Sequence, residues 1–322
     1  MHDEPSSQTT GESTITEILQ NVTFQFKTGG IASPRLDAEL LLAFVLKLQR
    51  LDLYLQADRP LSTIESREMS ELAKRRLDGI PVAYLLEKKE FWSLNLKIFP
   101  GVLIPRPETE LLVEIALPAM IRMQEKQQGR RLRVVDYGTG TGAILLAIAS
   151  ELENLDFLGG DLSSQALETA AINVETHRQM LEKSKHRVFL FQGKGLESFG
   201  REQSVDVLIS NPPYIRSDTI PTLSPEVNQE PRLALDGGVD GLEVFRNIFN
   251  EANESLVNGG ELMLEHGNDQ RNDLMELLEA YPHFGPPEYF DDLEGRPRVM
   301  KLVKQRMCIQ VLSLLLQRPL WY

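Results

Sequence analysis

The pattern of apolar and polar positions divides the chain into a helical part and a part with alternating strands and helices. Up to about residue 80, apolar side chains recur at helical spacing and predict three amphipathic helices. The first follows a capping box at Thr14 and Glu17, the second begins at Ser33, and the third follows a capping box at Ser62 and Glu65. Their expected apolar faces comprise Ile15, Ile18, Leu19 and Val22; Leu36, Leu40, Leu41, Phe44 and Leu48; and Met69, Leu72 and Ala73, with Leu77 near the end of the third helix. Such helices form a bundle that packs on its neighbour or a module that docks a substrate, and the pattern favours neither.

The period then changes. Leu94, Leu96 and Ile98 alternate with polar residues and predict a β-hairpin over residues 89–105. From Arg131 onward, short apolar runs alternate with helical segments, which is typical of a parallel sheet in an α/β protein. Strands are expected at 132–136, 156–160, 187–192, 205–210, 260–266, 287–290 and 298–303, and helices at 142–151, 164–182, 240–257 and 269–280. The expected domains are a helical domain (1–88), a hairpin linker (89–105), a sheet domain (106–304) and a C-terminal extension of unknown role (305–322).

Composition narrows the possible functions. The chain has 322 residues, of which 42% are hydrophobic and 25% charged, as in ordinary globular proteins of two domains. A net charge of −13 disfavours nucleic acid as a direct partner, because an acidic protein repels the phosphate backbone. The single cysteine, Cys308, excludes an internal disulfide, and five histidines without ligand spacing predict no metal site. An acidic, polar start and no long apolar run predict a cytoplasmic protein without a secretory signal or a membrane partner.

A glycine-rich turn follows the first strand of the predicted sheet. The order strand, turn and helix suits a cofactor loop, but the spacing G-x-G-x-G departs from the dinucleotide fingerprint. Asp136 ends the strand, where it would attract a cofactor with a cationic amino acid end rather than a pyrophosphate. Asp161 closes the next strand, where it could accept both hydroxyls of a ribose or cap the following helix. Together these features describe an S-adenosylmethionine site, although a generic βα turn would also account for the glycines. The candidate cofactor-binding residues are Asp136, Gly138, Thr139, Gly140, Thr141, Gly142, Asp161 and Asn211.

The tetrapeptide Asn211-Pro212-Pro213-Tyr214 follows the strand predicted at 205–210. The Asn211 side-chain oxygen and the Pro212 carbonyl can both accept hydrogen bonds from one planar NH2 group, and the Tyr214 ring can lie against it. Such a site would orient a nitrogen lone pair toward an electrophile, which is catalysis by positioning. A proline-rich turn is the alternative interpretation. The catalytic candidates are therefore Asn211, Pro212 and Tyr214.

A second candidate contact comes from Arg106, which lies between two prolines in the segment that opens a helix. Its rigid backbone favours a role in substrate binding, although a plain helix start is the alternative. The candidate substrate-binding residues are Asn211, Pro212, Pro213, Tyr214 and Arg106.

The motifs in this order resemble those of amino-methyltransferases that alkylate a planar NH2. More narrowly, the chain resembles the protein-(glutamine N5) methyltransferases of the HemK/PrmC family, which modify peptide chain release factors. The specific marks are Pro81-x-Ala83-Tyr84, Glu90-Phe91-Trp92, Leu103-Ile104-Pro105-Arg106-Pro107-Glu108-Thr109-Glu110, Asn211-Pro212-Pro213-Tyr214-Ile215, Glu230-Pro231-x-x-Ala234-Leu235, Gly237-Gly238-x-Asp240-Gly241-Leu242 and Asp292-Leu293-x-Gly295-Arg296-x-Arg298-Val299.

The resemblance implies a Rossmann-like class I methyltransferase sheet with a small N-terminal helical domain joined by the β-hairpin. It implies that residues 138–142 and Asp161 bind S-adenosylmethionine. Asn211 and Pro212 would hold the glutamine amide, with Tyr214 against it. The N-terminal helices would help to dock the release factor, whose target is the glutamine of its Gly-Gly-Gln loop. We expect the protein to act as a monomer.

The sequence departs from the family pattern at three places. Lys194 lies where an acid near the adenine is expected, Leu86-Glu87 replaces a glycine, and residues 305–322 extend past the usual end. Two other functions stay open at this point. An N6-adenine methyltransferase on DNA or RNA would use the same tetrapeptide but needs a basic groove, against which the net charge argues. A non-catalytic module that binds release factor or ribosome would have no need of an intact Asn211 to Tyr214 segment.

Overall fold

The computed structural model of the chain describes residues 13–127, 129–193 and 204–306, so Lys194, Cys308 and residues 307–322 lie outside the described part. The chain forms two compact units. One contains the described residues up to Glu87 together with Ser224–Gln229, and the other contains Lys88–Leu223 and the described residues from Glu230 onward.

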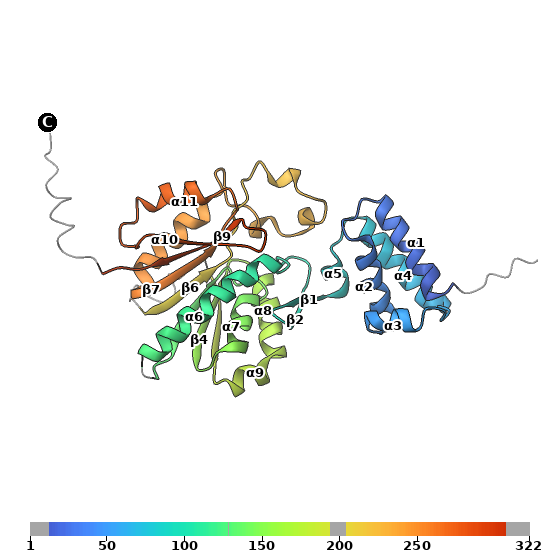
Figure 1. The fold of residues 1–322 in the computed structure, drawn as a ribbon, viewed down its shortest axis with the longest axis horizontal. Coiled ribbons are helices and arrows are strands. Elements are labelled where there is room, and N and C mark those ends of the chain that lie inside the picture. The colour runs from blue at the N-terminus through green and yellow to red at the C-terminus, as the bar shows by residue number, and fades with distance from the viewer. Residues whose placement is uncertain (1–12, 128, 194–203, 307–322) are drawn as a thin grey trace, which may run out of the picture. The chain divides into compact units, whose positions relative to one another are not determined.

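The first unit is helical (Figure 1). Its helices are α1 (Ile15–Thr28), α2 (Pro34–Leu46), α3 (Arg50–Leu55), α4 (Thr63–Leu77) and α5 (Val82–Leu86). Both predicted capping boxes are confirmed, since the Thr14 and Ser62 side chains accept from the third backbone N–H of α1 and α4, respectively. The short helices α3 and α5 were not predicted, because one or two turns are too brief to show a period.

The predicted buried face of α2 is wrong in part. Leu36 and Phe44 are 40% and 52% exposed, whereas Ala38, Leu41 and Leu42 are fully buried. The helix packs against both α1 and α4, so its buried stripe follows the positions between these two neighbours. In a run this rich in leucine, the spacing alone did not show which stripe would face the core.

A buried arginine holds the segment Ser224–Gln229 to the helices. The Arg76 side chain is 2% exposed, and its Nε donates to Asp37 Oδ2 at 2.8 Å. Its guanidinium also pairs with Glu226. Burial raises the pKa of Asp37, and the hydrogen bond from Arg76 opposes this shift. The sequence pattern gave no indication that this cation lies in the core.

The second unit begins with a hairpin of β1 (Lys88–Phe91) and β2 (Leu94–Lys97), and its turn residues Trp92 and Ser93 both have positive φ. The strands that follow are β3 (Leu132–Tyr137), β4 (Leu155–Asp161), β5 (Arg187–Gln192), β6 (Val205–Ser210), β7 (Leu256–Glu265), β8 (Glu288–Asp291) and β9 (Pro297–Val303). They form one sheet in the order β5-β4-β3-β6-β7-β9-β8, in which β9 runs antiparallel to both its neighbours. The predicted α/β class and mainly parallel sheet are confirmed.

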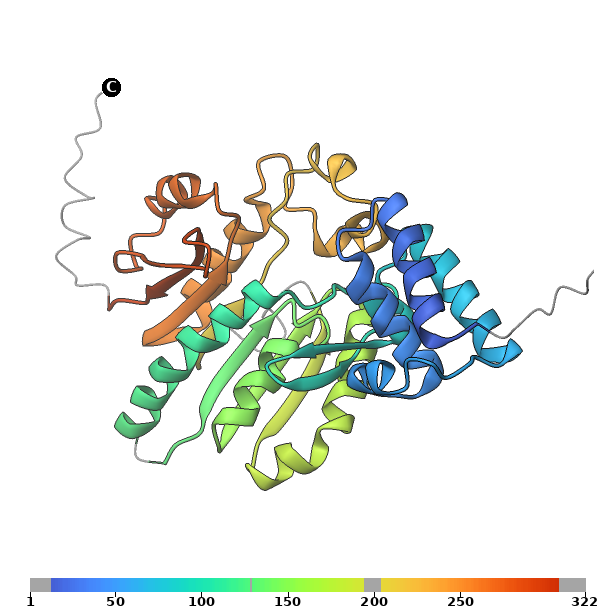
Figure 2. The same ribbon diagram turned by 45° about the vertical axis from the view of Figure 1, so that its right-hand side comes forward.

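Helices cover both faces of this sheet (Figure 2). They are α6 (Glu110–Lys126), α7 (Ala143–Glu151), α8 (Ser164–Thr176), α9 (Arg178–Lys183), α10 (Glu243–Ser255) and α11 (Arg271–Leu278). One row of residues crosses the sheet in register and packs under α10 and α11: Leu158, Val135, Leu208, Leu262 and Leu302. The register therefore fixes which side chains reach the core.

The single helix predicted over 164–182 is two helices. His177 leaves helical geometry, and its ring Nδ1 lies 2.9 Å from the Asn173 carbonyl oxygen. That side-chain contact competes with the regular backbone pattern at the junction. Among the described helices, none is both long enough and apolar enough to cross a membrane.

Arg76→Met tests the buried ion pair of the helical unit. Removing the cation leaves the buried Asp37 carboxylate without its partner, which is expected to cost about 3–5 kcal/mol of folding free energy. Denaturant unfolding followed by circular dichroism measures the loss. Arg178→Met, at exposed pairs with Glu175 on α8 and Glu182 on α9, is the matched control and should change little. Equal stabilities of the two variants would contradict the role of Arg76.

Candidate active site

The carboxyl ends of the parallel strands bring the sequence candidates together. Asp136 on β3 lies opposite Ile209 on β6, so Asn211 follows two residues further along the neighbouring strand. Ser210 on β6 lies opposite Leu264 on β7, which places Glu265 beside Asn211 in the register. This is the edge at which open α/β sheets bind their ligands.

The glycine-rich turn has a backbone that side chains would disfavour. Gly138, Gly140 and Gly142 have φ values of 71°, 55° and 78°, all in the left-handed region. The N–H groups of Gly138 and Thr139 both donate to the Gly160 carbonyl, which holds the turn against β4. The turn therefore has a fixed shape. Its two threonines, Thr139 and Thr141, are both buried.

Asp136 lies buried beneath this turn with one oxygen unsatisfied. Its Oδ2 accepts from the Thr139 hydroxyl at 2.7 Å, whereas its Oδ1 has no hydrogen-bond partner among the described residues. Burial raises the pKa of Asp136 to about 6, and the Thr139 hydrogen bond opposes this rise. A buried acceptor without a partner is a costly feature. The cationic amino group of S-adenosylmethionine fits this position, because it would supply both the donor and the charge.

Asp161 supports the same turn from β4. Its Oδ2 accepts from the Gly140 N–H at 2.9 Å, and its Oδ1 accepts from the Ser163 N–H at 2.9 Å. Burial raises the pKa of Asp161, while these backbone N–H groups favour its charged form. The helix cap itself is the Ser163 side chain. Each carboxylate oxygen keeps a second lone pair, so both the predicted ribose contact and a role in bracing the turn are compatible with this geometry.

The Asn211–Tyr214 segment is braced from behind by a second glycine segment. A side chain at Gly237 would approach the Tyr214 Cα and the Pro213 carbonyl to within 3 Å, and one at Gly241 would meet the Tyr214 carbonyl. The Gln270 side chain donates to the carbonyls of both Tyr214 and Gly241, at 3.1 Å each. Backbone packs directly on backbone here, so the tetrapeptide has little freedom to move.

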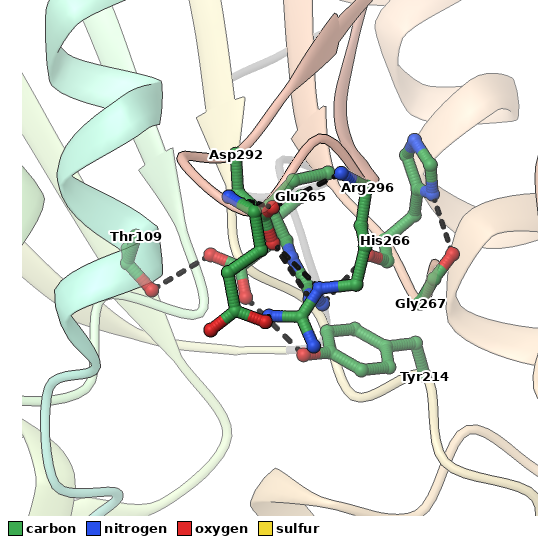
Figure 3. Close-up of polar contacts among 9 residues, drawn as sticks. Thr109, Tyr214, Glu265, His266, Gly267, Asp292 and Arg296 are labelled. Carbon is green, nitrogen blue, oxygen red and sulfur yellow. Dashed lines mark hydrogen bonds and ion pairs between the residues drawn. The ribbon is translucent and has the colours of Figure 1, made fainter. Parts of the chain in front are cut away.

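Two hydroxyl groups meet at the Glu265 carboxylate (Figure 3). The Thr109 hydroxyl donates to its Oε2 at 2.7 Å, and the Tyr214 hydroxyl donates to its Oε1 at 3.2 Å. Asn211 Nδ2 in turn donates to Thr109 Oγ1 at 3.0 Å. The Asn211 Oδ1 accepts no hydrogen bond from any described residue, so this oxygen is left as an acceptor for a ligand.

Burial dominates the electrostatics of this cluster. It raises the pKa of Glu265 to about 6, against the Thr109 hydrogen bond and the positive charge of Arg298. It also raises the pKa of Tyr214, and the Glu265 charge adds to that rise. The Tyr214 hydroxyl therefore stays protonated near neutral pH and acts as a donor, not as a base.

The predicted contact Arg106 is paired within the protein. Its guanidinium forms an ion pair with Glu230, a buried acid that also accepts from the Ile104 N–H at 3.0 Å. The side chain is 33% exposed, and its charge is among those that act on the Tyr214 hydroxyl. Arg106 thus lies near the tetrapeptide, and its contact with substrate stays a prediction.

The sequence analysis missed the roles of Thr109, Glu265 and Gln270. Glu265 carried a usable signal, because it is an acid at the end of a buried strand, the same signal that identified Asp136 and Asp161. Thr109 appeared only within a segment that carries the family resemblance, and Gln270 carried no signal. Their partners lie 156 and 56 residues away in the chain, respectively.

Comparison with known proteins places these features in context. Residues 17–86 match the model of the PrmC N-terminal domain, and residues 113–225 match that of the methyltransferase small domain. A protein of Coxiella burnetii named release factor glutamine methyltransferase is 42% identical over 288 residues, which cover 89% of this chain and 97% of that protein. A protein of the same name from Agrobacterium fabrum is 36% identical over 291 residues, covering 90% and 97%, respectively.

Among solved structures, the catalytic domain of human METTL16 in complex with an RNA hairpin matches with a TM-score of 0.51. It is 16% identical, and the match covers 73% of this chain and 82% of that chain. At this identity the likeness shows the fold alone, and it confirms the predicted methyltransferase sheet.

Asp136→Asn tests whether the ionised carboxylate of Asp136 lowers the stability of the folded protein. Because the pKa of Asp136 is raised to about 6 in the folded protein, its ionisation weakens folding as pH rises from about 4 through 6. The amide can still accept from Thr139 but carries no charge. We therefore expect the variant without ligand to be more stable by about 2 kcal/mol above pH 7 and the difference to vanish near pH 4.

Thermal unfolding at several pH values measures this difference. The matched control is Asp156→Asn near the start of the neighbouring strand β4, where the hydrogen bond from Arg187 lowers the pKa of the carboxyl. This second change should be destabilising at pH 7. A loss of stability in Asp136→Asn at pH 7 would show that the acid is satisfied within the protein.

Proposed function

Because this chain belongs to the family of release factor glutamine methyltransferases, we propose that it transfers a methyl group from S-adenosylmethionine to the side-chain amide nitrogen of the glutamine in the Gly-Gly-Gln loop of peptide chain release factors. Such a modification acts on translation termination. The family membership rests on relatives that align over nearly their whole length. The site observation that carries the proposal is the register of the paired strands β3 and β6, which brings Asp136 close to the segment that begins at Asn211. Among the described residues, Asp136 Oδ1 has no hydrogen-bond partner.

When bound, S-adenosylmethionine supplies an electrophilic methyl group on its sulfonium. Asp136 would hold the cationic amino group, residues 138–142 would give the amino acid end room beside the backbone, and Asp161 would accept from the ribose hydroxyls. The orphaned Asp136 Oδ1 supports the first of these roles. The positive φ of the three glycines supports the second.

Asn211 Oδ1 and the Pro212 carbonyl would accept the two hydrogens of the glutamine NH2, and the Tyr214 ring would pack against the amide plane. An amide nitrogen is a poor nucleophile, because its lone pair is delocalised into the carbonyl. Two acceptors on its hydrogens favour the positive charge that develops on nitrogen in the transition state. Asn211 has no useful basicity, and the surplus proton of the alkylated nitrogen leaves to water.

The N6-adenine alternative is not favoured by the named relatives, and the net charge of −13 disfavours a nucleic acid substrate. We propose that the protein acts as a monomer in the cytoplasm on a protein substrate, without a membrane partner. A cytoplasmic location follows from the proposed substrate, because release factors work at the ribosome.

The helical unit is the proposed docking module for the release factor. It exposes several large apolar side chains, namely Phe24, Phe44, Leu51, Tyr54, Leu55 and Ile64. Leu55→Asp is expected to raise the KM for release factor about tenfold while the KM for S-adenosylmethionine stays unchanged, because a charge opposes burial of that surface. An unchanged KM for release factor would remove Leu55 from the docking surface.

Incubation with radiolabelled S-adenosylmethionine tests the substrate. Separate reactions contain a release factor, its Gly-Gly-Ala variant and duplex DNA. The expected result is label on the unmodified release factor only. Label on DNA would move the assignment to adenine, whereas cofactor binding without label on any of these substrates would contradict the proposed reaction.

Asn211→Ala separates the transfer step from cofactor binding. When the Asn211 side-chain oxygen is removed, the glutamine NH2 loses one of its two acceptors. We therefore expect turnover to fall by at least about 100-fold. Affinity for S-adenosylmethionine, measured by calorimetry, should stay nearly unchanged. Asn253→Ala on α10 is the control and should retain activity. A loss of cofactor affinity as large as the loss of turnover would contradict this division of roles.

A further inference from the structure

The Asn211 carboxamide has two ends of opposite polarity, and only one orientation suits the proposed reaction. With Oδ1 toward the substrate it accepts from the glutamine NH2, whereas with Nδ2 in that place two donors would face each other. We propose that Thr109 and Glu265 are positioning residues that fix which end of the Asn211 amide faces the substrate. This inference rests on the proposed function, because it concerns the side chain that would hold the glutamine.

The orientation follows from counting protons along the hydrogen-bonded chain. An ionised carboxylate only accepts, so Glu265 Oε2 takes the single proton of the Thr109 hydroxyl. Toward Asn211 the Thr109 oxygen can then only accept. Asn211 must present Nδ2 to it, at 3.0 Å, and Oδ1 must point the other way. The assignment thus depends on the chemistry of the partners and not on the placement of two similar atoms.

The hydrogen-bonded series from Asn211 through Thr109 to Glu265 is buried, so water cannot easily replace its hydrogen bonds. Thr109 is only 4% exposed and lies in the short 3-10 helix Pro107–Thr109. Glu265 is 1% exposed and lies at the end of β7. The other Glu265 oxygen accepts from the Tyr214 hydroxyl, so the same carboxylate also places the ring that would pack on the glutamine. One buried acid therefore orients two of the three catalytic candidates.

Protonation of Glu265 would reverse this order. A neutral carboxyl can donate to Thr109, which then turns its own proton toward Asn211 and requires Oδ1 on that side. The charged and titratable groups that act on Glu265 are Glu108 from the 3-10 helix, Tyr214 from the tetrapeptide and Arg298 from β9, and the Thr109 hydroxyl adds a hydrogen bond. Burial outweighs the lowering contacts and raises the pKa of Glu265 to about 6. The productive orientation is therefore present above this pH and is lost as pH falls through it.

The first test is Thr109→Val, which keeps the shape and removes the hydroxyl. We expect the single-turnover methylation rate, at saturating S-adenosylmethionine and release factor, to fall about 100-fold, a loss typical of a misplaced reacting group. Thr109→Ser should restore most of the rate. Thr169→Val is the control, because this equally buried threonine on α8 donates only to the Gln165 carbonyl. A rate for Thr109→Val equal to that of Thr169→Val would overturn the proposal.

The second test is the pH profile, which a merely structural role of Glu265 would not change. The wild-type rate should fall about tenfold per pH unit below pH 6. Glu265→Gln cannot titrate, so its rate should be flat from pH 5 to pH 8. Saturating cofactor keeps Asp136 paired and removes its own titration from the profile. A wild-type profile without an acid limb, or an acid limb that survives in Glu265→Gln, would contradict the relay.

A measurement that does not depend on turnover tests the hydrogen bond directly, also in variants that are inactive for another reason. In protein labelled with ¹⁵N-asparagine, the Asn211 side-chain NH2 resonance is identified by its absence in Asn211→Ala. Its hydrogens should exchange slowly with water in the wild type and in Thr109→Ser, and rapidly in Thr109→Val. Equal exchange in all three would refute the hydrogen bond to Thr109.

The two levels of the argument fail in different ways. If the wild type does not label release factor, the proposed function is wrong, whatever the NMR shows. If the wild type labels it but Thr109→Val is equally fast and keeps its melting temperature and cofactor affinity, only the positioning role is wrong.

Discussion

The parallel pairing of β3 with β6 is the constraint on which the whole site depends. In its register Asp136 lies opposite Ile209, so the proposed cofactor acid and Asn211 lie near the ends of neighbouring strands, at the same edge of the sheet. A slip of one residue would turn every side chain of one strand to the other face. The buried row of Val135, Leu208 and Leu262 opposes such a slip, because the slip would remove the side chains of one strand from the core that they share with α10. Core packing thus fixes the distance between the two halves of the chemistry.

The site uses two buried acids in opposite ways. Among the described residues, one oxygen of Asp136 has no hydrogen-bond partner, so its charge would be costly until the proposed cation binds there. Both oxygens of Glu265 accept hydrogen bonds from hydroxyl groups of the protein, so this acid is already satisfied and serves to orient its donors. Burial raises the pKa of each to about 6, yet the two shifts mean different things. The pattern of partners, and not the shift itself, separates a ligand-binding acid from a positioning acid.

The sequence predicted those parts of the site in which neighbours along the chain act together. The glycine turn and the Asn211–Tyr214 tetrapeptide are local, so residue type and spacing describe their geometry almost fully. The contact of Thr109 with Glu265 joins residues 156 positions apart, and no spacing in one sequence encodes it. The same limit explains the error at Phe44 and the unforeseen burial of Arg76. In each case the deciding partner lies on another element.

The path of the chain after the tetrapeptide brings together two of the segments that carry the family resemblance, residues 103–110 and 230–235. Ile215 pairs with Leu235 and Gly237, so the segment between them leaves the tetrapeptide and returns to it. Within this segment, Glu230 accepts from the Ile104 N–H and pairs with Arg106. Prolines on both sides of Arg106 stiffen its backbone. Arg106 and Glu230 thus form an anchor that closes the loop behind Tyr214. The Arg106 side chain stays 33% exposed and its charge acts on the Tyr214 hydroxyl, so this pairing would also hold the guanidinium in place for the proposed contact with substrate.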